Sequence, residues 1–93
     1  MFKEASGMHY TTYDDKTVMD GVSGLWCCNA GHCHPKIVEA IQKQAETLDY
    51  ATAFQLGHPT IFAMAEKLVD MAPEELTHAF FTNSGSEAVD TAL

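Results

Sequence analysis

Arginine is absent from this sequence, and lysine is scarce. The 93 residues carry 5 lysines against 13 acidic residues, which leaves a formal net charge of −8. Proteins that bind nucleic acids neutralise phosphates with clustered lysine and arginine side chains. The sequence has no such cluster, so we expect no nucleic-acid partner.

Long apolar runs are missing as well. Hydrophobic residues make up 46% of the chain, but they occur in short runs, whereas a membrane-spanning helix needs about 20 consecutive apolar residues. The first residues, MFKEA, lack the basic and then apolar layout of a secretory signal. The sequence predicts a globular cytoplasmic protein that does not enter a membrane, and its length suffices for one small core.

The cysteines do not follow a metal-binding spacing. Cys27, Cys28 and Cys33 lie close to His32 and His34, but the intervals match neither paired Cys-x-x-Cys motifs nor a Cys2His2 finger. An odd number of cysteines in a chain without an export signal favours free thiols. We expect no metal, with a zinc site at this cluster as the alternative.

Hydrophobic periodicity predicts an α/β succession of elements. Residues 8–13 and 17–19 read as a β-hairpin, and an irregular stretch follows from Asp20. Two amphipathic helices begin at the dipeptides His34-Pro35 and His58-Pro59, because proline suits the first helical turn.

The last part of the chain predicts a strand, a loop and a helix. Residues 77–82 read as a short buried strand, residues 83–86 as a tight loop, and Glu87 begins a third helix. A helix start offers unpaired N–H donors and the positive end of the helix dipole. With Gly85 for close approach and the hydroxyls of Ser84 and Ser86, the loop is a candidate phosphate site.

An interpretation without a ligand also explains this loop. An ordinary capping box, with Ser84 or Ser86 as cap and Glu87 in the first turn, explains the same residues without a ligand. The loop is neither a Walker A motif nor a Gly-x-Gly-x-x-Gly fingerprint. The loop alone therefore leaves both the cap and the phosphate site open.

Three segments together resemble the class III aminotransferases. They are DGVSGLWCCNAGHCHP at residues 20–35, LDYATAFQLGHP at residues 48–59 and FFTNSGSEAVDTAL at residues 80–93. They occur in the family's order, and they are most similar to the omega-amino acid:pyruvate (beta-alanine:pyruvate) branch. The resemblance implies an α/β fold-type I transferase of the aspartate aminotransferase type, dependent on pyridoxal 5'-phosphate (PLP).

The resemblance also assigns roles to individual residues. Gly85 and Ser86 match the positions that hold the cofactor phosphate, and Ser84 shapes the same loop. Trp26 matches an aromatic wall of the substrate pocket, and Phe54 is expected to line that pocket too. Plain core packing is the alternative for both aromatics, because large aromatic side chains are commonly buried.

The resemblance further implies that the chain is an incomplete N-terminal portion. Residues 1–55 would belong to the small domain, and residues 56–93 would open the large PLP-binding domain. The lysine that forms a Schiff base with the cofactor and the arginine that binds a substrate carboxylate are expected downstream, so the chain alone is not expected to be catalytic. The intact protein would be a homodimer or higher homo-oligomer that uses an amino donor and a keto acid acceptor.

A second class of function stays open beside the enzyme. The chain could be a non-catalytic remnant, or a module that binds a phosphate or a partner chain. Such a piece would expose apolar surface that the rest of an enzyme otherwise covers.

Overall fold

The structure is a computed structural model that describes residues 1–52 and 54–93. The chain divides into two compact units, Met1–Tyr50 and Ala51–Leu93. Ala53, which lies within the resembling segment at residues 48–59, is outside the described residues.

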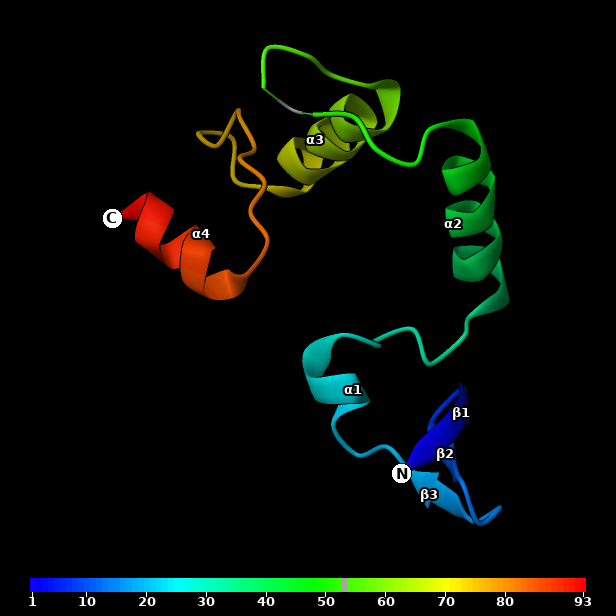
Figure 1. Ribbon diagram of the computed structural model, residues 1–93. Helices are drawn as coiled ribbons and strands as arrows, with labels where there is room; N and C mark the ends of the chain where they lie inside the picture. The colour runs from blue at the N-terminus through cyan, green and yellow to red at the C-terminus, as the bar shows by residue number, and fades with distance from the viewer. Residues whose placement is uncertain (53) are drawn as a thin grey trace. The chain divides into compact units, whose positions relative to one another are not determined.

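The first unit begins with a three-stranded antiparallel sheet of β1 (Phe2–Ser6), β2 (His9–Thr12) and β3 (Thr17–Met19), in that order (Figure 1). The predicted hairpin is confirmed by the pairing of β2 with β3. The strand β1 was not predicted, because charged residues and a bulge between Phe2 and Glu4 interrupt its alternation. Its pairing with β2 supplies the third strand, and an isolated hairpin is marginal in water.

A loop from later in the chain is attached to this sheet at Gly7. The Gly7 N–H donates to the His32 carbonyl at 3.0 Å, and the His32 N–H donates to the Gly7 carbonyl at 2.8 Å. Gly31, with φ of +87°, lies so close that a Cβ on it would be 3.2 Å from the Gly7 oxygen. Only glycine allows both this backbone angle and this approach.

The two helices that open at His-Pro dipeptides are confirmed. They are α2 (Pro35–Thr47) in the first unit and α3 (Pro59–Met71) in the second. His58 caps α3 by accepting the Ile61 N–H through Nδ1 at 3.4 Å. The helix ends shortly before Pro73, as expected from the clash between a proline ring and a helical backbone.

The final helix, α4 (Gly85–Ala92), begins earlier than predicted. The sequence predicted its start at Glu87, but Ser84 is the N-cap and Gly85 is already helical. The predicted irregular stretch after Asp20 contains α1 (Ser23–Trp26), a single turn with unusual backbone angles.

The predicted strand at residues 77–82 is wrong. These residues form no strand, and the side chain of Phe80 is 79% exposed. A strand requires a hydrogen-bonded neighbour. The chain's strands all lie in the first unit, as far as the structure describes it, and none pairs with this segment.

The expected small core is also wrong. No hydrophobic side chain is buried among the described residues, and Asp20 is the one buried residue there. The apolar stripes predicted for α2 and α3 contain no buried side chain: Ile41 and Phe62 are exposed, and Leu68 is half-buried. Amphipathic helices gain most of their stability by covering such a stripe, and the described residues do not provide that cover.

Residues 1–52 and 54–93 contain no helix with the length and apolar character needed to cross a membrane.

We expect the isolated 93-residue chain to show no sharp thermal unfolding transition, because cooperative unfolding depends on a packed apolar core. It is expected to bind an apolar dye at neutral pH through its exposed helix faces. Calorimetry and dye fluorescence measure these two properties. A single cooperative heat-absorption peak without dye binding would contradict the expectation.

Candidate active-site segments

The loop before α4 is organised by the side chain of Ser84. Its Oγ accepts the Glu87 N–H at 3.2 Å, and its carbonyl accepts the Ala88 N–H at 3.1 Å. The Glu87 carboxylate turns back and accepts the Asn83 N–H through Oε2 at 2.8 Å. The capping interpretation is therefore correct for Ser84 and Glu87. The Ser84 side chain accepts the Glu87 N–H, and the Glu87 side chain accepts the N–H of Asn83, which precedes Ser84.

The cap does not use the hydrogen-bond donors of the next two residues. In the part of the chain that the structure describes, the N–H groups of Gly85 and Ser86 and the Ser86 hydroxyl have no hydrogen-bond partner. A Cβ built on Gly85 would meet nothing within 4 Å. The cap and the anion site are thus compatible, because they use different donors of the same helix start.

The donors of these two residues are of the kind that an anion binds. Two backbone N–H groups and one hydroxyl lie at the positive end of α4, where negative charge is favoured. The nearest acid, Glu87, has its carboxylate engaged by Asn83. The available donors are mainly backbone N–H groups.

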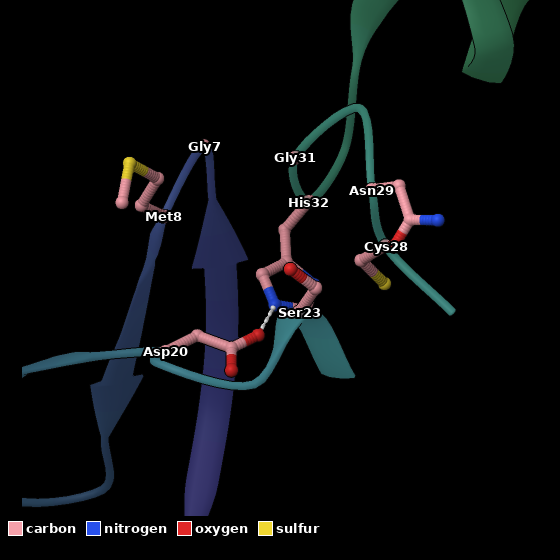
Figure 2. Close-up of a pocket in the computed structure, with 8 residues that line it drawn as sticks. All are labelled: Gly7, Met8, Asp20, Ser23, Cys28, Asn29, Gly31 and His32. Atoms are coloured by element: carbon pink, nitrogen blue, oxygen red, sulfur yellow. Dashed lines mark hydrogen bonds and ion pairs between the residues drawn. The ribbon is translucent and has the colours of Figure 1, made fainter. Parts of the chain in front are cut away.

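In the first unit, the buried carboxylate of Asp20 collects several donors. Its Oδ1 accepts the Val22 N–H at 3.0 Å, and its Oδ2 accepts the Gly24 N–H at 2.6 Å. The same Oδ2 lies 2.6 Å from His32 Nε2, as the dashed line in Figure 2 shows. We call Asp20, these two backbone donors and His32 the Asp20 cluster.

The Asp20 cluster has consequences for the ionisation of its members. The hydrogen bond from His32, followed by that from the Val22 N–H, lowers the pKa of Asp20 from 3.8 to about 2. Burial raises the pKa of Tyr10, and the neighbouring Asp20 carboxylate raises it further. The Tyr10 ring also lies against His32, with ring centroids 4.5 Å apart. Asp20 therefore stays ionised across the physiological range.

The turn α1 runs in the left-handed sense. Ser23, Gly24, Leu25 and Trp26 have φ of 51°, 58°, 55° and 73°. A left-handed conformation costs an L-residue roughly 1–2 kcal/mol, so three of these residues are strained. Gly24 avoids that cost, and a Cβ at this position would also lie 3.0 Å from Cys28 Sγ.

Both predicted substrate-wall aromatics are highly exposed. Trp26 lies at the end of the left-handed turn with 85% of its surface accessible, and Phe54 in the second unit is 77% accessible. Among the described residues, neither ring stacks on another. Neither ring is packed in a core formed by the described residues.

The cysteine and histidine cluster does not assemble a ligand set. Cys27, Cys28 and Cys33 are free thiols. Across residues 1–52 and 54–93, no three His, Cys, Asp or Glu side chains are arranged to hold one metal ion. His32, which the zinc alternative counted as a ligand, is paired with Asp20 instead.

Sequence reasoning missed the Asp20 cluster. The signal for it was weak: an aspartate followed by Gly-Val-Ser-Gly is typical of a side chain that accepts nearby backbone N–H groups. The partnership with His32, twelve positions later, has no local signature. It depends on the attachment of the His32 loop to Gly7.

The profile of the Aminotransferase class-III family matches residues 1–93. The chain therefore belongs to the class-III aminotransferases, a family that depends on PLP and has the fold-type I architecture.

Two relatives illustrate the similarity within this family. The chain is 57% identical to the omega-aminotransferase of Caulobacter vibrioides over 93 residues, covering 100% of the chain and 21% of the relative. It is 48% identical to the beta-alanine–pyruvate aminotransferase of Pseudomonas aeruginosa over 89 residues, covering 96% of the chain and 20% of that protein. The chain thus spans about a fifth of the length of these relatives.

Solved structures of aminotransferases have the same fold over this chain. The adenosylmethionine-8-amino-7-oxononanoate aminotransferase of Methanocaldococcus jannaschii matches with a TM-score of 0.94 at 33% identity, over 99% of this chain and 21% of that one. An amine transaminase from an uncultivated Pseudomonas species, solved in its PLP-bound form, matches with a TM-score of 0.91 at 35% identity, with the same coverage.

We expect the Asp20 cluster to stabilise the protein in a pH-dependent way. The pKa of Asp20 is about 2 when folded and 3.8 when not, so its contribution is complete above pH 3.8 and is lost as the pH falls towards 2. In a full-length protein that carries this chain, the difference in unfolding free energy between wild type and Asp20→Asn is therefore expected to shrink below pH 3.8. Denaturant unfolding at several pH values measures it, and a pH-independent difference would contradict the assignment.

Proposed function

We propose that this chain is a segment of a PLP-dependent aminotransferase that transfers an amino group from an omega-amino acid or amine to pyruvate or a similar keto acid. The observation that carries the proposal is the 57% identity to an omega-aminotransferase over the whole chain. Identity to an acetylornithine aminotransferase of the same family is lower, at 44%. This difference favours the omega-amino acid branch.

In this proposal the loop before α4 binds the cofactor phosphate. Gly85 and Ser86 donate their N–H groups, and Ser86 adds its hydroxyl. Ser84 holds the loop by capping α4, which leaves those donors directed away from the helix. When bound, PLP supplies the electron sink that amino transfer requires.

Trp26 and Phe54 are proposed to form apolar walls of the substrate site. Small-ligand pockets combine aromatic walls with a few polar anchors. The exposure of both rings supports the role, because each offers its apolar face to a ligand or to another part of the protein. Such walls orient the amino donor and exclude water from the reacting atoms.

The lysine that binds the cofactor covalently is proposed to come from outside these residues. Lys3, Lys16 and Lys43 form ion pairs with neighbouring carboxylates. Lys36 and Lys67 lie on α2 and α3. The chain by itself is therefore proposed to be catalytically inactive.

The same proposal includes the domains, the assembly and the location of the protein. Residues 1–55 are assigned to the small domain and residues 56–93 to the start of the large PLP-binding domain. The apolar faces of α2 and α3, which contain no buried side chain among the described residues, suit burial in a complete enzyme and its homodimer or higher homo-oligomer. A cytoplasmic location agrees with the use of pyruvate as acceptor.

Ser86→Ala is expected to weaken PLP binding. A hydrogen bond to a charged group contributes about 1.5–3 kcal/mol, which corresponds to roughly 10–100-fold in Kd. Titration of the full-length apoprotein with PLP, followed by absorbance, measures this. Thr91→Ala removes a hydroxyl further along α4 and serves as the matched control. Equal affinities for Ser86→Ala and wild type would disprove the role of this hydroxyl.

Trp26→Ala is expected to change donor selectivity. Loss of an aromatic contact of about 0.5–1.5 kcal/mol lowers the ratio of kcat/KM for benzylamine to that for β-alanine by roughly 2–12-fold. The assay follows alanine formation from pyruvate by the full-length holoenzyme. Absence of alanine formation with any of these donors would favour the non-catalytic alternative, and an unchanged ratio would contradict the role of Trp26.

A further inference from the structure

We infer that Asp20 is a positioning residue for Trp26: its buried carboxylate, held by His32, locks the left-handed turn whose last residue presents the indole to the substrate site. This inference rests on the proposed role of Trp26 as a substrate wall. It adds a residue that acts through the turn and does not itself contact substrate.

The contacts of the carboxylate lie at the start of the turn. Asp20 accepts the N–H groups of Val22 and Gly24, one on each oxygen. The Val22 carbonyl in turn accepts the Trp26 N–H at 3.0 Å. The Asp20 side chain therefore holds the two peptide groups that flank the one whose carbonyl accepts the Trp26 N–H.

The turn needs such an external constraint. Ser23, Leu25 and Trp26 adopt positive φ values that L-residues disfavour. Backbone in this region persists only where surrounding contacts over-determine it. Without the two acceptor oxygens of Asp20, we expect Ser23 and Leu25 to return to ordinary backbone angles and to redirect the indole.

Backbone hydrogen bonds attach Asp20 and His32 to the residues that join β1 and β2. The Asp20 N–H donates to the Met8 carbonyl at 2.8 Å, and the backbone of His32 is paired with Gly7. The His32 ring lies against Tyr10, which stacks on Phe2 with ring centroids 4.4 Å apart. Asp20 thus connects the turn to strands β1 and β2.

The Trp26 indole is mostly exposed to solvent. Trp26 is 85% exposed, and within the described residues it has no ring partner. Its direction is therefore set by the backbone of the turn.

Asp20 lies on one side of a cavity of ≈ 220 Å³ that Gly7, Ser23, Cys28 and His32 also line (Figure 2).

The test is a double-mutant cycle in the full-length holoenzyme with Asp20→Asn and Trp26→Ala. The readout is the ratio of kcat/KM for benzylamine to that for β-alanine, with pyruvate as acceptor. Asparagine keeps the size of the side chain but has one acceptor oxygen and no charge. Asp20→Asn alone is expected to change the ratio about threefold or more, mainly through KM, and by less than about 1.5-fold when Trp26 is already alanine.

The controls separate positioning from general damage. Asp14→Asn makes the same chemical change in the exposed turn between β2 and β3 and is expected to leave the ratio unchanged. PLP affinity is expected to be the same in wild type and Asp20→Asn. If Asp20→Asn yields no folded holoenzyme, His32→Gln enters the cycle in its place and is expected to show the same non-additive pattern.

Three results would overturn the inference. The first is an equal change of the ratio by Asp20→Asn in both backgrounds, which means that Asp20 acts independently of Trp26. The second is an unchanged ratio in Asp20→Asn while Trp26→Ala shifts it. If Trp26→Ala alone has no effect, the proposed role of Trp26 fails and the inference fails with it, whereas the PLP titration still tests the phosphate loop separately.

Discussion

The buried carboxylate of Asp20 is the contact on which the first unit depends. It accepts hydrogen bonds from two backbone amides and from His32, and the Asp20 backbone N–H donates to the Met8 carbonyl in the turn between β1 and β2. A buried charge is stable only when its donors are in place. The left-handed turn, the His32 loop and the sheet therefore form one mutually dependent arrangement, although they contain no hydrophobic core.

The second unit depends on a different kind of constraint. Ser84 ends the extended chain and begins α4, and Glu87 closes the cap from the other side. This local arrangement requires no packing from elsewhere. It explains how a site made of backbone donors is formed by a few adjacent residues, while the neighbouring segment at residues 77–82 lacks the partner strands that would make it part of a sheet.

The absence of buried apolar side chains connects the fold to the proposed function. The described residues bury no side chain of the stripes of α2 and α3, and they expose Trp26 and Phe54. The chain spans about a fifth of the length of its relatives. We propose that the remaining chain and a second subunit of an aminotransferase cover these faces.

The sequence by itself determined the features that are local. Proline at the first helical turn marked α2 and α3, the capping pattern indicated a helix start near residues 84–87, and three ordered motifs identified the family. Tertiary structure alone decided the pairing of Asp20 with His32, the strand β1 and the left-handed turn. The reason is that each of these depends on contacts between distant residues or on strained backbone, which local propensity disfavours. The same reason explains the error at residues 77–82, where the local pattern was that of a strand but the neighbouring strands were missing.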